Sequence, residues 1–290
     1  MPPLFSVIIP TYNRAERLQQ TLKSVLQQQF GDYEVLVIDD GSTDHTQQMI
    51  LDAFGHYPQL RYYHKCNEER SVARNYGIER AKGRFLVFFD SDDHMHPNHL
   101  STLAQHIEKN PDHHFFATKF DMFDGQRRFG STLAAMTTGS YTYHFLLKGG
   151  SLNALVCAER AHLKAKFRPE FNICEDWIFC LENLYYQPIY LIDAITVTVI
   201  DHSGRSMANN QAVIAAKLRA VEVLIQSLPF SVQEQELLRK HAWRFCAIHA
   251  YLDGRTTQAL GFWKKSPHFL SLLKILVGKK RIERIRTYLS

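Results

Sequence analysis

The feature that most constrains this chain is an alternation, four times over in its first 110 residues, of short apolar runs and amphipathic helical patterns. The strand-like runs are Phe5–Pro10, Glu34–Ile38, Arg61–His64 and Phe85–Phe89. Apolar residues recur at helical spacing between these runs, and a fourth helical pattern extends from Pro97 through Ile107. Strands joined by helices pair in parallel. The pattern therefore predicts an α/β, Rossmann-like fold, with a right-handed, mostly parallel twisted sheet flanked by helices.

The fourth apolar run ends in three carboxylates within four positions, Asp90, Asp92 and Asp93. Side chains alternate along an extended segment, so Asp90 and Asp92 can project to the same side at the carboxyl end of the strand. Ligands bind at that end in open α/β sheets. Two close carboxylates repel unless a cation lies between them, and oxygen ligands of this kind suit Mg²⁺ or Mn²⁺. An Asp-rich turn or a helix cap is the alternative for an isolated pair.

Polar clusters also lie beside the other runs. Thr11–Asn13 follows the first run, Asp39–Asp40 follows the second, and Arg74–Asn75 precedes the fourth. Strand ends that are distant in the sequence converge at one edge of such a sheet. Together the clusters supply groups for a base and a ribose and carboxylates for a cation, which is the inventory of a nucleotide-sugar pocket.

The pattern is looser after residue 110. Phe115–Phe120, Leu152–Cys157 and Ile189–Ile200 are predicted strands, the first two separated by a polar loop at 124–139, and Trp177–Tyr186 is a predicted helix. From Met207 the pattern is almost continuously helical. Its expected breaks are Pro229, Gly254, Pro267 and Gly278.

The chain has 290 residues and a net charge of +5, which is unevenly placed. From Lys264 onward eight Lys or Arg and one Glu give +7, which leaves the preceding 263 residues at −2. A near-neutral body argues against a nucleic-acid-binding protein. In the tail, Ile282, Ile285 and Leu289 recur at helical spacing beside basic residues. This predicts either a packed C-terminal helix or an amphipathic element on an anionic membrane surface.

The sequence shows no membrane-spanning or secretory signal. No apolar run approaches the roughly 18 residues of a spanning helix, and Leu4–Ile9 enters a strand-like pattern directly. Its five cysteines are widely spaced and contain no Cys-x-x-Cys pair, which indicates neither a disulfide framework nor a zinc site. We expect a cytoplasmic protein, with the tail as a possible contact to the inner face of the plasma membrane.

Four segments together resemble the family 2 glycosyltransferases of GT-A fold. They are Phe5–Arg14 (FSVIIPTYNR), Val37–Asp44 (VIDDGSTD), Ala73–Asn75 (ARN) and Asp90–Asp93 (DSDD). The likeness is dense over the first 110 residues and sparser to Ser206, which predicts a catalytic domain at 1–206 and a helical C-terminal region at 207–290. It implies an inverting transfer of a sugar from a nucleotide-diphosphate sugar, with a UDP-sugar as first choice, to an acceptor hydroxyl. A glycan or lipid-linked acceptor in bacterial surface polysaccharide or glycolipid assembly is the expected partner.

The resemblance also assigns roles to residues. It implies that the nucleotide is bound by Pro10, Thr11, Tyr12, Asn13, Asp39, Asp40, Arg74, Asp90 and Ser91. Tyr12 would offer its ring to the nucleobase, Asp39 would accept a hydrogen bond from the base, and Asp40 would lie near the ribose. The family's Asn-x-Gly segment is replaced here by Asn67–Arg70, which has no glycine.

The resemblance further implies the metal ligands and the general base. Asp92 and Asp90 form the family's Asp-x-Asp, and His202 follows the last strand where relatives place a histidine near the metal or the diphosphate. Asp176, in Cys174–Trp177, matches the aspartate that deprotonates the acceptor. Its apolar neighbours favour a partly buried carboxylate with a raised pKa. Without the resemblance, an acidic first turn of a helix is the plainer interpretation.

Two other enzyme classes are compatible with parts of the pattern. A phosphotransferase of haloacid dehalogenase type also has Asp-x-Asp after an apolar strand, but it wants that motif on the first strand and a smaller residue at the place of His94. A sugar nucleotidyltransferase would need a glycine-rich loop where Pro10–Asn13 stands. A catalytically inactive nucleotide-binding module is the non-enzymatic alternative.

Overall fold

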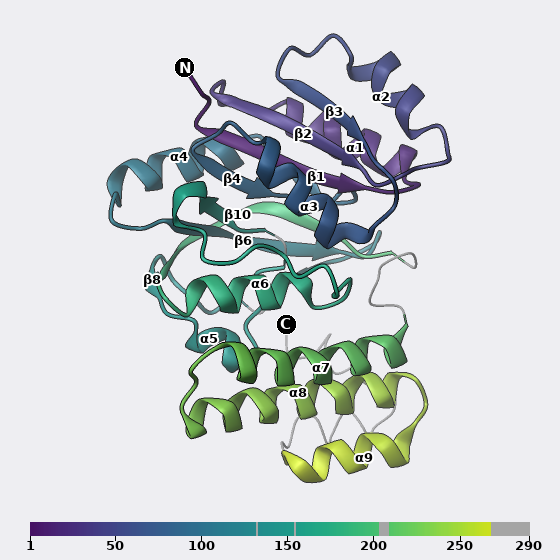
Figure 1. The fold of residues 1–290 in the computed structure, drawn as a ribbon, viewed down its shortest axis with the longest axis vertical. Helices are drawn as coiled ribbons and strands as arrows, with labels where there is room; N and C mark the ends of the chain where they lie inside the picture. The colour runs from purple at the N-terminus through teal and green to yellow at the C-terminus, as the bar shows by residue number, and fades with distance from the viewer. Residues whose placement is uncertain (132, 154, 203–208, 268–290) are drawn as a thin grey trace. The chain divides into compact units, whose positions relative to one another are not determined.

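The computed structural model describes residues 1–131, 133–153, 155–202 and 209–267. Its contacts divide the chain into two compact units. The first unit comprises Met1–Leu146 and Gly150–His202, and the second comprises Leu147–Gly149 and Ser203–Ser290. The predicted domain boundary at residue 206, the break expected at Gly278 and the predicted amphipathic tail after Pro267 lie outside the described residues. Each unit is treated below by itself (Figure 1).

The first unit is built on one mixed sheet with the order β3-β2-β1-β4-β9-β6-β10-β5, to which β7 adds beside β6 and β8 beside β10. The strands are β1 (Phe5–Thr11), β2 (Tyr33–Asp39), β3 (Leu60–His64), β4 (Phe85–Phe88), β5 (His94–Met95), β6 (Phe115–Phe123), β7 (Arg128–Gly130), β8 (Gly139–Tyr141), β9 (Cys157–Glu159) and β10 (Ile189–Ile200). The first four in the order are parallel, as is the β6–β10 pair. The predicted α/β sheet flanked by helices is confirmed.

Helices cover the sheet in the order that the alternation predicts. They are α1 (Ala15–Leu26), α2 (Thr46–Phe54), α3 (Glu69–Arg80), α4 (His99–Lys109), the short α5 (His144–Leu147), a 3₁₀ turn (Arg160–His162) and α6 (Glu175–Leu184). Right-handed crossovers from β1 to β2 and from β2 to β3 place α1 and α2 on one face, and the return from β3 to β4 places α3 on the other. α3 packs on β1 and β2 there (Figure 1).

The parallel register aligns the strand ends that carry polar residues. β1 pairs along its whole length with β2, so that Thr11 lies opposite Asp39, while its pairing with β4 ends at Ile8 opposite Phe88. β1, β2 and β4 are buried at every position, which explains their continuous apolar runs. Asp39, Asp40 and the Asp90 segment therefore leave the sheet at one edge.

Two details of the second half of this unit differ from the prediction. The strand predicted at Leu152–Cys157 lies instead at Cys157–Glu159, because Asn153 adopts a left-handed backbone with φ of 49°, which no extended strand allows. Leu152 and Val156 are buried as loop residues instead. The polar loop predicted at 124–139 contains β7, where Arg128 pairs with Asp121 of β6 at 2.7 Å.

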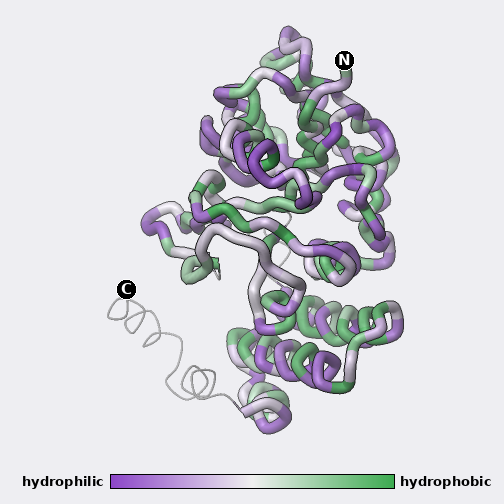
Figure 2. Tube along the Cα trace, turned by 90° about the vertical axis from the view of Figure 1, so that its left-hand side faces the viewer, coloured by the Kyte–Doolittle hydropathy of each residue, from purple (hydrophilic) through white to green (hydrophobic). Residues whose placement is uncertain are grey.

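Residues 209–267 of the second unit form three helices that lie side by side, α7 (Asn210–Ser227), α8 (Val232–Leu252) and α9 (Thr256–Lys265) (Figure 1). The predicted breaks at Pro229 and Gly254 separate them, and Pro267 follows α9. α8 starts at a capping box of Ser231 and Glu234. Hydrophobic and hydrophilic residues alternate along these helices (Figure 2). In the described parts of the chain, no helix is both long and apolar enough to cross a membrane.

Small residues let these helices approach closely. The buried cluster that joins them consists of Ile214, Cys246, Ala247, Ala250 and Ala259. In the first unit, Gly77 has the same effect where α3 crosses β1. A β-carbon on Gly77 would lie 2.4 Å from Cγ2 of Ile8, so only glycine allows this approach.

We predict that Gly77→Ala destabilises the first unit by about 1–3 kcal/mol, because the added methyl group overpacks the contact with Ile8 and this cost exceeds the gain in helix propensity of about 1 kcal/mol. Gly261→Ala in α9 is the matched control. A β-carbon there meets no atom within 4 Å, so this exposed helical position should be neutral or stabilising. Thermal and urea unfolding of both variants checks the prediction. A Gly77→Ala protein as stable as the parent would contradict the close contact.

Candidate active site

Asn13 ties together the loops that follow β1 and β2. Its side-chain oxygen accepts hydrogen bonds from the amides of Thr43 and Asp44 at 2.7 and 3.2 Å, and its own amide donates to Ser42 Oγ at 2.8 Å. Asn13 has φ of 49°, a left-handed conformation that asparagine tolerates well. The sequence run TYN therefore fixes one loop on its neighbour.

Asp39 is fully buried beneath these loops. Its Oδ1 accepts from the amide of Ser42 at 2.8 Å and its Oδ2 from the hydroxyl of Tyr62 at 2.6 Å. Burial, and then the hydrogen bond to the Asp39 carboxylate, raise the pKa of Tyr62. Tyr62 thus stays a neutral donor, and each Asp39 oxygen keeps a lone pair for a ligand.

Two groups of the predicted nucleotide site near Asp39 are open to a ligand: an exposed ring, and a hydroxyl oxygen without a hydrogen-bond partner among the described residues. Tyr12 is 46% exposed, whereas Pro10 and Thr11 are buried within β1. Thr11 Oγ1 is a buried hydroxyl oxygen with no hydrogen-bond partner among the residues that the structure describes. A buried polar atom of this kind is costly unless a ligand or water completes it.

Asp40 holds the loop between β3 and α3. Its Oδ1 binds Lys65 Nζ at 2.7 Å and the amide of Glu68 at 3.1 Å. Glu69 follows with φ of 73°, in the left-handed region that a side chain disfavours. Glu69 stands where the family's Asn-x-Gly segment has its glycine. A residue with a side chain therefore occupies a backbone conformation that glycine adopts without steric cost.

Arg74 of α3 is 1% exposed and lies between two carboxylates. Its Nη2 binds Asp90 Oδ1 at 2.7 Å, and its Nη1 binds Glu175 Oε1 at 2.9 Å. The guanidinium also lies over the ring of Phe167, 5.1 Å from its centroid. Burial alone would lower the pKa of Arg74, but the negative charges of Asp90, Glu175 and Asp176 raise it. Arg74 is a permanent buried cation in the site.

The predicted metal ligands converge. One carboxylate oxygen from each of Asp90, Asp92 and Asp93 lies within 4.8 Å of the other two. His202, at the end of β10, reaches Asp92 Oδ2 with its Nε2 at 2.9 Å. Arg14 Nη1 lies 2.5 Å from the same oxygen. Ser91, between the two metal-site aspartates, is buried.

The carboxylates fit a hard divalent cation, since they offer several oxygens within the reach of one ion. Asp93 is the only buried carboxylate of the three, at 6% exposure, and its Oδ1 accepts from the amide of Ile200 at 3.0 Å. Asp90 and Asp92 are therefore the main candidate ligands, with His202 beside them.

Asp176 lies in the first turn of α6, next to Glu175. Its Oδ1 accepts from the amide of Trp177 at 2.7 Å. Cys174, just before the helix, has a left-handed backbone with φ of 66°, which turns the chain sharply into α6. Glu175 is 5% exposed, and burial raises its pKa despite the opposing charge of Arg74. The ion pair of Arg74 with Glu175 thus links the metal-site carboxylate Asp90 to the turn that carries the predicted base.

Sequence reasoning did not single out Arg14 or Tyr62 as parts of this site, and it did not predict that Glu175 pairs with Arg74. Arg14 stands in the run FSVIIPTYNR, and Glu175 stands beside Asp176, so each was adjacent to a residue that was singled out. Their partners are 78 and 101 residues away in the sequence. No local pattern indicates contacts of that range.

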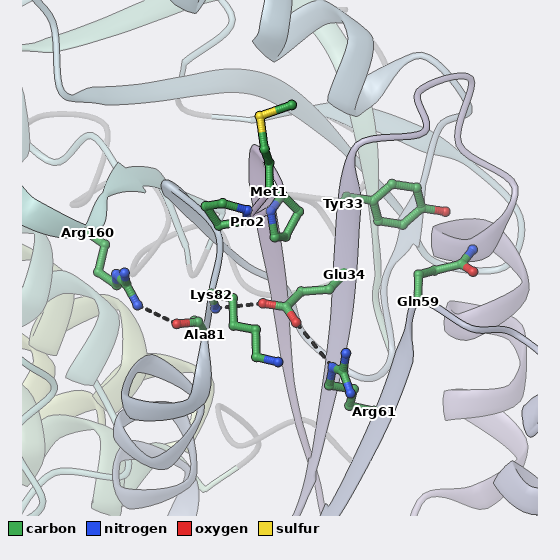
Figure 3. A pocket seen from close by; sticks show the side chains of 10 residues that line it. Met1, Pro2, Tyr33, Glu34, Gln59, Arg61, Ala81, Lys82 and Arg160 are labelled. Atoms are coloured by element: carbon green, nitrogen blue, oxygen red, sulfur yellow. Dashed lines mark hydrogen bonds and ion pairs between the residues drawn. The ribbon is translucent and has the colours of Figure 1, made fainter.

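A surface pocket lies at the opposite edge of the sheet, around the amino ends of β1 and β2 (Figure 3). Its lining residues are Met1, Pro2, Pro3, Tyr33, Glu34, Gln59, Arg61, Ala81, Lys82 and Arg160. Glu34 in its wall accepts from Ser6 Oγ, and it also accepts from the amide of Lys82 and from Arg61 (Figure 3). Glu34 joins three elements and has a structural role. The pocket contains none of the predicted site residues.

A second cluster of side chains that could bind a metal lies away from the strand-end carboxylates. It consists of His114, Glu159 and His162. Both histidines contact Glu159 Oε2, at 2.7 and 3.2 Å, and Arg84 binds Oε1 at 2.7 Å. The two imidazole rings stack with centroids 3.4 Å apart and planes 5° apart. An ion bound to both rings would lie far outside their planes, so this arrangement fits a hydrogen bond of His114 and an ion-pair contact of His162 with Glu159 rather than metal binding.

Known proteins resemble this chain in sequence and in fold. Residues 6–159 match the model of the glycosyl transferase family 2. The chain is 34% identical over 115 residues to the GalNAc(5)-diNAcBac-PP-undecaprenol beta-1,3-glucosyltransferase of Campylobacter jejuni, a stretch that covers 39% of this chain and 37% of that enzyme. The matched stretch is only a small part of the longer curated relatives. It spans 19% of the length of an uncharacterized glycosyltransferase of Rickettsia bellii.

Solved structures show the same fold. S. aureus TarS 1–349 in complex with UDP-GlcNAc matches with a TM-score of 0.71 and 23% identity, over 91% of this chain and 81% of that one. The mannosyltransferase PcManGT from Pyrobaculum calidifontis in complex with GDP-Man and Mn²⁺ matches with a TM-score of 0.63 and 15% identity, over 94% and 78% of the two chains. The family model covers more than half of the chain and includes the strand-end carboxylates and Arg74. The chain therefore belongs to glycosyl transferase family 2 and not to the haloacid dehalogenase or nucleotidyltransferase classes.

Proposed function

We propose that this protein is an inverting glycosyltransferase that moves a sugar from a nucleotide-diphosphate sugar to an acceptor hydroxyl. The observation that carries the proposal is the buried chain of charges Asp90–Arg74–Glu175, which joins the candidate metal site to the turn bearing Asp176. A donor site and an acceptor base must lie close together for direct transfer. This arrangement, together with the family membership, supports a catalytic site rather than an inactive nucleotide-binding module.

The nucleotide would bind over the loops that Asn13 joins. The exposed ring of Tyr12 is available to stack on a base, and Asp39 is a fixed acceptor for a base N–H. The unpartnered Oγ1 of Thr11 would gain a partner from the nucleotide. We propose a UDP-sugar as donor. The UDP-GlcNAc bound by TarS, which has the same fold, supports this choice.

Asp90 and Asp92, with His202 beside them, would hold the Mg²⁺ or Mn²⁺ ion. The bound ion would supply positive charge where the departing nucleoside diphosphate accumulates negative charge. The chain's own residues position the groups that react. Arg74 orients Asp90, and it keeps Glu175 paired so that the first turn of α6 stays in place.

Asp176 would act as the general base. Its carboxylate accepts the proton of the acceptor hydroxyl while the hydroxyl oxygen forms a bond to the anomeric carbon. The bond from that carbon to the diphosphate oxygen breaks on the opposite face, and the electron pair leaves with the nucleoside diphosphate. A single displacement of this kind inverts the anomeric configuration. Base catalysis at such a step contributes about 10² to 10⁴ in rate.

We further propose a glycan or lipid-linked acceptor, as in bacterial surface polysaccharide or glycolipid assembly. The name of the Campylobacter relative, which contains an undecaprenol-linked glycan, supports a lipid-linked acceptor. The basic residues from Lys264 onward would attract an anionic membrane in which such an acceptor lies.

A first prediction concerns the metal. EDTA should abolish transfer, and Asp92→Asn should reduce it by about 10² or more, because the leaving diphosphate loses its counter-charge. Mn²⁺ titration and release of UDP from UDP-sugars measure the effect. Asp52→Asn is the matched control, since this exposed carboxylate of α2 lies outside the site. Full activity of Asp92→Asn in chelator would exclude the proposed metal role.

A second prediction separates binding from chemistry. Asp176→Asn should keep its affinity for UDP, because the base acts on the acceptor, and should lose kcat by about 10² or more. Asp39→Ala should instead weaken UDP binding. Calorimetry and initial rates separate the two effects. If Asp176→Asn turns over normally, the base lies elsewhere, and Glu175 is the next candidate.

A third prediction concerns the tail. The full chain should sediment with anionic vesicles at low salt and leave them at high salt, since each basic side chain near such a surface contributes about 1 kcal/mol. A chain that ends at Pro267 should stay in the supernatant and still bind UDP. Equal sedimentation of the two chains would show that the tail does not bind membranes.

A further inference from the structure

Each of the two metal-site aspartates already has an arginine of its own. Asp90 pairs with Arg74 at 2.7 Å, and Asp92 pairs with Arg14 at 2.5 Å. These contacts neutralise two carboxylates that stand close together at one strand end, which otherwise repel each other. They also place guanidinium groups where the proposed cation must bind.

The two arginines differ in how exposed their side chains are. The side chain of Arg74 is 1% exposed and also binds Glu175. The side chain of Arg14 is 26% exposed and reaches Asp92 from the end of the β1 loop. The backbone of Arg14 is fixed, because Asn13 is tied to the next loop and the carbonyl of Arg14 accepts from the amide of Leu18. Only the side chain would need to move, which makes Arg14 the displaceable partner.

The charges at Asp92 show why displacement would occur. Arg14 Nη1 and His202 Nε2 both approach the same oxygen, Oδ2, at 2.5 and 2.9 Å. A divalent ion on this carboxylate would stand within a few ångströms of the guanidinium, and the two positive charges would repel each other. The donor diphosphate, which arrives with the ion, carries negative charge that a guanidinium binds through two parallel hydrogen bonds.

We propose that Arg14 is the counter-ion of Asp92 while the donor is absent and that it moves to the donor diphosphate when the metal takes its place. Arg14 is then a further donor-binding residue that links metal binding to nucleotide binding. The inference rests on the proposed function, because it requires a metal and a nucleoside diphosphate at this site. It explains why a site with several carboxylates is stable before either ligand binds.

The proposal predicts opposite effects of one substitution on two ligands. In Arg14→Gln, the affinity for Mn²⁺ alone should rise about threefold or more, because the competing charge on Asp92 is gone. The affinity for UDP in saturating Mn²⁺ should fall about tenfold, because a charge-assisted contact to the diphosphate is lost. Electron paramagnetic resonance of free Mn²⁺ and calorimetry with UDP measure the two constants.

Two further variants complete the experiment. Arg17→Gln removes a positive charge from an exposed position on α1 and should leave both constants within twofold of the parent, which controls for general electrostatics. Arg14→Lys keeps a positive charge for Asp92 but not the planar donor pair, so it should bind Mn²⁺ like the parent and UDP more weakly. It also tests the proposal if Arg14→Gln does not fold.

The outcomes distinguish the inference from the proposed function. Weaker binding of both ligands to Arg14→Gln would show a structural role for Arg14 and overturn the inference, and so would unchanged binding of both. In either case, a parent protein that binds Mn²⁺ and UDP leaves the proposed function standing. A parent protein that binds neither ligand would overturn the proposed function and the inference together.

Discussion

The buried ion pairs of Arg74 are the interaction on which the rest of the site depends. A guanidinium with 1% exposure can remain in the interior only because Asp90 and Glu175 both bind it, and removing one partner of such a pair costs about 3–5 kcal/mol. The three groups come from different parts of the chain: α3, the segment after β4, and the first turn of α6. Replacing them by apolar residues of similar volume would be neutral or favourable for stability. Their value is geometric, because they hold three elements in one arrangement.

The same arrangement explains how several acids share one edge of the sheet. Asp39 is held by neutral donors, Ser42 and Tyr62, while Asp40 is paired with Lys65. Asp90 and Asp92 each form an ion pair with an arginine, and Asp93 accepts a hydrogen bond from a backbone amide. The candidate site is therefore a set of acids that each have a hydrogen-bond or ion-pair partner, not a patch of unpaired negative charge. Under the proposed function, a donor with its cation would bind here by exchanging these partners, and the carboxylates would already be in place.

Much of this fold could be predicted from the sequence, because its signals are local. The run Phe85–Phe89 and the periodic apolar residues between strands depend on neighbours within a few positions, and β1, β2, β3 and β4 appear where they were expected. The predicted strand at Leu152–Cys157 was wrong because the left-handed backbone of Asn153 overrides an apolar pattern. The convergence of Asp90, Asp92 and His202 followed from the resemblance. The pairs Arg14–Asp92 and Arg74–Glu175 could not be predicted, since they join residues 78 and 101 positions apart and depend on the packing of the whole sheet.

The backbone conformation of Glu69 has a consequence for the mobility of the loop between β3 and α3. A residue with a β-carbon in the left-handed region costs about 1–2 kcal/mol relative to glycine, and the contacts of Asp40 with Lys65 and the Glu68 amide offset that strain. Local opening of this loop therefore costs less free energy than opening of a loop with glycine at the same position would. Low-energy local opening is a property of segments that admit ligands. We expect the amide hydrogens of this loop to exchange with solvent before those of the fully buried β1, so that the proposed nucleotide would enter and leave the site beside Asp40.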